Sequence, residues 1–99
     1  MKKVTKADLE QREADQHRAK MDAIVVSRFQ AKAAMDEEGL LDQVEDYMVG
    51  DDVSRFTRLA WEEGSFRRGS KLIQTVGEEL GLSTEDIDNL FLKAKDITA

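Results

Sequence analysis

The chain has 99 residues, of which 36% are charged, and it contains no cysteine and no proline. This length suits one domain, because domains mostly hold ~50–200 residues. The missing cysteines exclude disulfides, thiolate zinc sites and cysteine nucleophiles. No apolar run approaches the ~20 residues that cross a bilayer, and polar residues follow Met1-Lys2-Lys3. We therefore expect no membrane span, no secretory signal and a cytoplasmic location.

The formal net charge of −6 is distributed in blocks of alternating sign. Residues 1–32 carry a net +3, and residues 33–54 carry eight acids and no base. Residues 55–71 again carry +3, and residues 72–99 carry −4. Such alternation favours contacts between oppositely charged surfaces, within the molecule or between copies, over uniform binding to a polyanion. The competing interpretation places these charges on solvated helix faces that need no partner.

The first predicted element is a long helix from about Lys6 to Glu38. Thr5 and Asp8 form a capping pair at its start, and no glycine interrupts the chain before Gly39. The two halves of this predicted helix differ in composition. Its first half is polar except for one leucine, and its second half carries an apolar stripe at helical spacing.

We therefore divide the chain into a polar helical arm, residues 1–20, and a helical domain, residues 21–99. Pairs of opposite charge four residues apart add only ~0.2–0.5 kcal/mol each, so the arm depends on a partner or frays. The run Ile24-Val25-Val26 suits a strand by propensity. Its flanks are helix formers and no second strand is evident, so the helix is preferred.

Four further helices are predicted, each from apolar residues at three-to-four-residue spacing. Their inner faces contain Leu40, Leu41, Val44 and Met48; Val53, Phe56, Leu59 and Ala60; Leu72, Ile73, Val76 and Leu80; and Ile87, Leu90, Phe91 and Ala94. The second of these helices is expected to be capped by Asp51 or Asp52, with Arg55 and Arg58 on its outside. Ser83 and Asp86 form a capping box for the last. The sequence predicts an all-α fold: a compact bundle of about five helices with a long polar N-terminal helix.

The segment from Val76 to Leu90 resembles a helix-turn-helix unit, with Gly77 in the first helix and Gly81 in the turn. The resemblance implies that the bases of DNA would face Thr84, Glu85, Asp88 and Asn89. Three acids among residues 84–89 oppose this use, because phosphate attraction supplies most non-specific affinity. We therefore prefer a helix pair that serves packing, and we do not expect nucleic acid as the partner.

Five basic residues lie close to Trp61 and Phe66 in the sequence: Arg55, Arg58, Arg67, Arg68 and Lys71. Arginine binds phosphate or carboxylate through two parallel hydrogen bonds, and aromatic neighbours add stacking. This group is therefore a candidate site for phosphate or for an acidic partner. The alternative is that Trp61 anchors the core while the bases pair with the acids of residues 36–52.

No catalytic site, metal site or cofactor is predicted, and we expect a protein that is not an enzyme. The carboxylates at residues 36–38, 51–52 and 86–88 lack the glycine and distal glutamate of a calcium loop. Acidic pairs occur throughout the chain, so none stands out for acid–base catalysis. The single histidine, His17, lies on the polar arm and is most simply a solvated helix residue.

Residues 58–97 contain Trp61, Phe66-Arg67-Arg68-Gly69-Ser70, Leu80-Gly81-Leu82-Ser83 and Ile87-Asp88-Asn89-Leu90-Phe91. This stretch resembles the C-terminal part of small accessory proteins encoded by tailed bacteriophages and prophages. The resemblance implies a phage accessory or virion-associated protein that binds another protein, in the host cytoplasm or in the virion. It carries over no functional residue.

The sequence favours a non-catalytic module that docks to a protein partner or to copies of itself, for instance through residues 6–35. The expected protein-binding residues are Met21, Ile24, Val25, Phe29, Asp42, Glu45, Asp46 and Trp61. Two alternatives stay open. One is a helix-turn-helix-like regulator that binds nucleic acid, and the other is an acidic protein that imitates DNA and blocks a DNA-binding protein.

Overall fold

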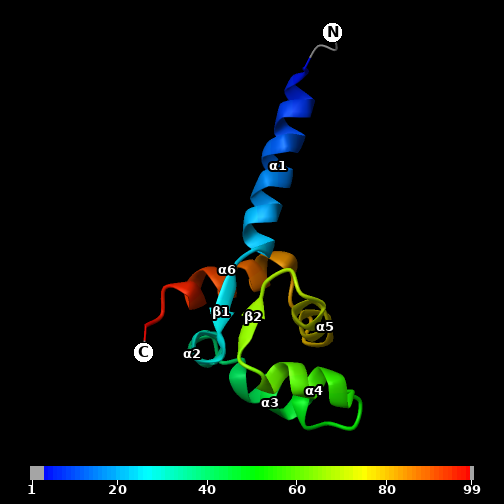
Figure 1. Ribbon diagram of the computed structural model, residues 1–99, viewed down its shortest axis with the longest axis vertical. Helices are drawn as coiled ribbons and strands as arrows, with labels where there is room; N and C mark the ends of the chain where they lie inside the picture. The colour runs from blue at the N-terminus through cyan, green and yellow to red at the C-terminus, as the bar shows by residue number, and fades with distance from the viewer. Residues whose placement is uncertain (1–3, 99) are drawn as a thin grey trace.

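A single helix projects from a small helical body in the computed structural model, which describes residues 4–98 (Figure 1). The described chain forms α1 (Lys6–Asp22), β1 (Val25–Ser27), α2 (Arg28–Glu37), α3 (Leu41–Met48), α4 (Arg55–Glu62), β2 (Ser65–Arg67), α5 (Lys71–Glu79) and α6 (Thr84–Lys95). The predicted helical class is confirmed. A strictly all-α fold with about five helices is wrong, because the described residues form six helices and a two-stranded sheet.

The long helix expected from Lys6 to Glu38 is broken in its middle by β1. Helix α1 ends at Asp22, and the β-branched run that follows extends as a strand. Ser27 then begins a new helix, because its side chain accepts a hydrogen bond from the Gln30 amide while the Gln30 side chain binds the Ser27 amide. This capping box stops α1 and α2 from continuing into each other.

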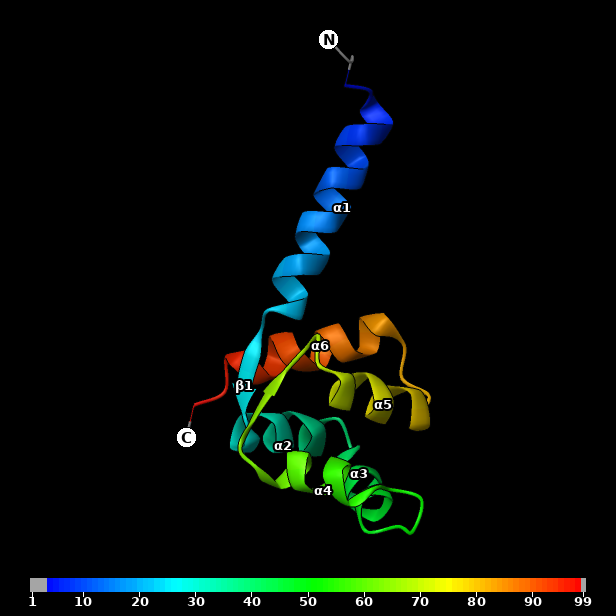
Figure 2. The same ribbon diagram turned by 45° about the vertical axis from the view of Figure 1, so that its right-hand side comes forward.

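The two strands form a short antiparallel ribbon in which Val26 lies opposite Phe66. Both of these side chains are buried, whereas their strand neighbours Val25 and Arg67 are exposed. Figure 2 shows the ribbon within the body, where β1 packs against α2 and α6. The ribbon thus closes the body at the foot of α1.

The hydrophobic core lies where the helices of the body meet this ribbon. Trp61 of α4 stacks on Phe66 of β2, with ring centroids 5.2 Å apart and planes inclined by 23°. The buried cluster contains Val26, Ala34, Val44, Met48, Val53, Trp61, Phe66, Val76, Ile87, Phe91 and Ala94. Every element of the body contributes to it, and α1 does not.

Five of the six helices described in residues 4–98 begin at a residue whose side chain caps them, and α3, which follows Leu40, has no such cap. The capping boxes predicted at Thr5 and at Ser83 are confirmed. Helix α4 is capped by Ser54, whose hydroxyl accepts the Thr57 amide at 3.1 Å, rather than by either preceding aspartate. No helix within residues 4–98 combines the length and the apolar character needed to cross a membrane.

The inner face expected for α4 is also wrong in part. Phe56 and Leu59 point away from the core and are 81% and 47% exposed. Arg58 turns inward instead, and its guanidinium donates to the backbone oxygens of Met48 at 3.0 Å and Gly50 at 3.1 Å. These carbonyl oxygens lie at and just after the C-terminal end of α3, where backbone acceptors lack partners within the helix. Arg58 therefore occupies the inner side of α4, where the sequence predicted apolar residues.

Replacing Val26 with alanine should lower the free energy of unfolding by about 1.5–3 kcal/mol, because its side chain is buried against the core. The matched control Val25→Ala alters the exposed neighbour and should cost less than about 1 kcal/mol. Urea denaturation followed by circular dichroism measures both. Equal losses would contradict the alternation of buried and exposed residues in β1.

Candidate interaction surfaces

The arm is the part of the molecule with the fewest contacts. Every residue from Val4 to His17 is exposed, and burial begins only at the last turn of α1 with Arg18 and Met21. A helix of 17 residues is about 25 Å long, which is a large share of the 56 Å length of the molecule. The arm therefore offers a long surface that the body does not cover.

Local interactions hold the helix of the arm. Besides its capping box, it has a hydrogen bond from Gln11 to Asp15 at 2.9 Å and an ion pair between Arg18 and Asp22 at 2.9 Å. Helices that are polar on all sides depend on such pairs or on a partner. Most of the stability of a protein helix comes from packing of an apolar face, which α1 lacks before Met21.

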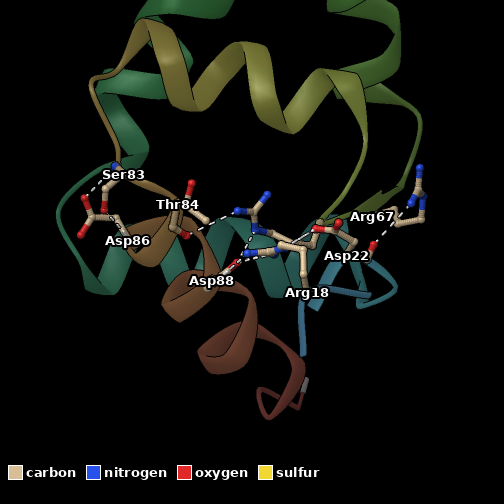
Figure 3. Close-up of polar contacts among 8 residues, drawn as sticks. Arg18, Asp22, Arg67, Ser83, Thr84, Asp86 and Asp88 are labelled. Atoms are coloured by element: carbon tan, nitrogen blue, oxygen red, sulfur yellow. Dashed lines mark hydrogen bonds and ion pairs between the residues drawn. The ribbon is translucent and has the colours of Figure 1, made fainter. Parts of the chain in front are cut away.

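A cluster of charged residues, the junction cluster, joins the arm to the body: Arg18, Asp22, Arg68 and Asp88. Figure 3 shows Arg18 between Asp22 and Asp88. Arg18 donates to both carboxylate oxygens of Asp88, from Nη2 at 2.8 Å and from Nη1 at 3.0 Å. Arg68 donates to the same carboxylate from Nε at 2.7 Å. Asp88 of α6 therefore binds the arm and the end of β2 together.

Backbone contacts reinforce the junction cluster. The amide of Arg68 donates to the Ile24 carbonyl at 2.9 Å, and the amide of Gly69 donates to the Asp22 carbonyl at 3.0 Å. A Cβ atom at position 69 would lie 2.8 Å from the Asp22 Cβ and 3.1 Å from its carbonyl oxygen. Only glycine lets the two segments approach this closely.

Within the junction cluster, Asp88 and Arg18 shift each other's pKa. Hydrogen bonds from Arg18 lower the pKa of Asp88, burial of the carboxyl opposes this, and Arg68 lowers the pKa further. The hydrogen bond to Asp88 raises the pKa of Arg18 in turn. Arg68 is only 8% exposed, and a buried arginine is tolerated only where an anion faces it. The buried charge of Arg68 therefore depends on Asp88, and the more exposed Arg18 adds to the same carboxylate.

The apolar residues predicted to bind a partner fall into two groups. Met21 and Trp61 are buried and do not present their side chains, and Ile24 is half-buried against the core. Val25 and Phe29 are 57% and 54% exposed and lie just beyond the foot of the arm. The exposed part of the predicted anchor is therefore Val25 with Phe29.

The predicted acidic residues lie on α3. Asp42 and Asp46 are exposed, and Glu45 forms an ion pair with Lys32 at 2.8 Å. Two further acids of the same block, Glu37 and Glu38, pair with Lys93 of α6 at 3.0 and 2.8 Å. Part of the acidic block, residues 33–54, is therefore neutralised by lysines that lie outside residues 55–71.

The five basic residues do not share one role. Arg68 is engaged with Asp88, Arg58 caps α3, and Arg67 donates to the Asp22 carbonyl at 3.4 Å. Arg55 and Lys71 are exposed, and the structure gives neither side chain a hydrogen bond or ion pair within residues 4–98. What this group offers to a phosphate or an acidic partner is therefore mainly Arg55, Lys71 and part of Arg67.

A helix-turn-helix would direct Asp88 toward bases, but the structure turns this residue elsewhere. Its carboxylate turns toward Arg18 and Arg68 and is 15% exposed.

Within residues 4–98, no group of three or more metal-binding side chains is close enough to hold an ion. Comparison with protein-family models, curated proteins and solved structures found no match to this chain.

Sequence reasoning missed Arg18 and Asp88 as partners. The spacing of Arg18 and Asp22 signals a local pair, but nothing in the sequence joins position 18 to position 88. It also missed the exposure of Phe56, because the apolar spacing of α4 fits either face of that helix.

Removing the central carboxylate with Asp88→Ala should cost about 3 kcal/mol of unfolding free energy, because it leaves Arg68 buried without an anion. Arg18→Ala should cost about 1 kcal/mol, since Arg18 is 36% exposed and solvent screens its pairing. Asp46→Ala, at an exposed acid, is the control and should stay within about 0.5 kcal/mol. A loss for Asp88→Ala no larger than the control would refute this role.

The junction cluster should also weaken in acid. The folded state lowers the pKa of Asp88, so its contribution is fully present above about pH 4 and is lost as pH falls through the lowered value. The difference in unfolding free energy between the wild type and Asp88→Asn should shrink over this range. Hydrogen bonds with Ser83 also lower the pKa of Asp86. Because Asp86 is present in both proteins, its contribution cancels in the difference between their unfolding free energies. A difference independent of pH between 5 and 2 would contradict this linkage.

Proposed function

We propose that this protein is a non-catalytic interaction module whose helical arm captures a protein partner or a second copy. One observation carries this proposal: α1 stands clear of the body, with exposed residues from Val4 to His17. A polar helix with so few contacts gains most from a surface that packs along it.

The foot of the arm supplies the apolar part of the proposed surface. Val25 and Phe29 are exposed there, within seven residues of the end of α1 at Asp22. The arm adds Leu9, which is 51% exposed, among charges of both signs. Central apolar anchors with a polar surround are typical of protein interfaces. The junction cluster supports the proposal because it holds the base of the arm at a fixed place on the body.

We further propose a phage-encoded accessory or virion-associated protein as the biological setting. The support is the resemblance carried by residues 58–97, and in particular by the Phe66–Ser70 and Ile87–Phe91 segments. An interaction module of this size needs no active site. Its specificity would come from the charges and apolar anchors that it presents.

Replacing Leu9 with serine should weaken partner capture about tenfold or more, because burying a leucine at an interface supplies about 1.5–3 kcal/mol. The matched control is Leu92→Ser, at an exposed leucine of α6. Full-length wild type and both variants serve as baits in the source-cell lysate, and mass spectrometry quantifies the recovered partner. Both variants should keep unfolding free energies within about 1 kcal/mol of the wild type.

Light scattering on the same proteins tests self-association through the arm. The proposal fails if the wild type is a strict monomer and Leu9→Ser recovers the same partners in the same amounts as the control. Loss of capture in both variants would also contradict the role of the arm. It would show that any exposed leucine replaced by serine weakens capture, wherever it lies.

A further inference from the structure

Helix α4 carries a second unpartnered surface, on the face turned away from the core. Its inner side holds the buried Trp61 and the arginine that caps α3. Its outer side presents Phe56 and Leu59, and Phe56 is the most exposed large apolar residue of the described chain at 81%. An aromatic ring so exposed in the first turn of a helix, with Leu59 exposed one turn further on, forms an apolar pair rather than a single scattered surface residue.

The charges on this outer face follow a definite order. Arg55 begins the helix, the apolar pair follows, and Glu62 and Glu63 end it. Positions 55, 56, 59, 62 and 63 share one side of a helix by their spacing. All three charged residues are exposed, and within residues 4–98 none of their side chains has a hydrogen bond or an ion pair.

This order is unfavourable for α4 itself. The N-terminus of a helix carries a partial positive charge and the C-terminus a partial negative charge, so acids belong at the start and bases at the end. Helix α4 has neither an acid in its first turn nor a base in its last. Helices α2 and α5 begin with a base and end with acids as well, so this order alone does not distinguish α4. What distinguishes α4 is that Phe56 is exposed beside terminal charges that have no side-chain partner within residues 4–98.

We infer that two copies of this chain pair through α4 in antiparallel fashion about a two-fold axis near Leu59. In an antiparallel pair centred there, residue 55 of one copy lies opposite residue 63 of the other, twice over. Each Arg55 then meets a glutamate, and the two Phe56 rings pack beside the two Leu59 side chains. A two-fold interface must be complementary to itself, and apolar residues flanked by opposite charges at the two ends meet that condition.

The pairing surface is small, which determines its strength. Eight helical residues span about 12 Å, so the contact falls at the low end of the size of specific interfaces. We therefore expect a weak dimer that dissociates in the micromolar range and that salt weakens further.

This inference does not rest on the proposed role of the arm. Figures 1 and 2 show α1 and α4 at opposite ends of the long axis of the molecule. A partner on the arm and a second copy on α4 therefore use different surfaces, and either can fail without the other. A dimer would join two arms in one particle and so raise their avidity for a repeated partner.

Sedimentation equilibrium of the full-length protein tests the pairing with two charge reversals. R55E and E63R each place like charges opposite each other twice in a homodimer, so each should raise the dissociation constant about tenfold or more. In an equimolar mixture, the heterodimer regains opposite charges at both positions and should form about as well as the wild-type dimer. Both reversals suit the helix dipole of α4, so misfolding does not account for lost pairing.

Phe56→Ser tests the apolar centre against Leu92→Ser, which removes an exposed apolar side chain of α6 outside both proposed surfaces. The first should abolish the dimer and the second should retain it. Leu9→Ser should also retain it, which separates this inference from the function proposed for the arm. A wild type that stays monomeric at millimolar concentration overturns the inference. So does a dimer that survives Phe56→Ser, or a mixture of R55E and E63R that associates no better than either alone.

Discussion

The shared carboxylate of Asp88 determines how the arm relates to the body. An aspartate in the first half of α6 binds one arginine from α1 and one from the end of β2, at 2.8 and 2.7 Å. Apolar burial contributes little there beyond Met21, so polar geometry fixes the foot of the arm. Polar anchoring of this kind is directional, because a bidentate guanidinium donates its two hydrogen bonds to a carboxylate in one plane. It is also sensitive to acid and to the loss of any one member, unlike an apolar contact.

The elements that the sequence predicted well are those determined by neighbouring residues. Capping boxes at Thr5 and Ser83 depend on residues three positions apart, and apolar stripes located the helices of the body. The strands were missed because each is three residues long and their pairing joins Val26 to Phe66, forty positions away. The β-branched run at Ile24 was a real signal. Without a visible partner, its helix-forming flanks outweighed it.

Charge counts predicted opposite surfaces, and the structure shows opposite charges pairing, but between other segments than those expected. Lys32 and Lys93 form ion pairs with the acidic block 33–54, whereas Arg58, Arg67 and Arg68 bind Asp88 or backbone oxygens. Block totals cannot locate such pairs, because each depends on how distant segments are packed. The predicted protein-binding residues were affected in the same way, because their burial also depends on how distant segments pack. Met21 and Trp61 were expected at an interface, yet large apolar side chains at the junctions of elements are the first to enter a core.

The outer face of α4 differs from the other helices of the body in the partners of its terminal charges. Helix α6 has acids in its first turn and lysines in its last, which is the order that the helix dipole favours. Helices α2, α4 and α5 have the opposite order. In α2 the acids at the C-terminal end pair with Lys93, and α5 exposes no large apolar residue. Helix α4 alone among these three combines an exposed aromatic ring, Phe56, with terminal charges that have no side-chain partner within residues 4–98, and a second copy with the complementary charge order would cover both features.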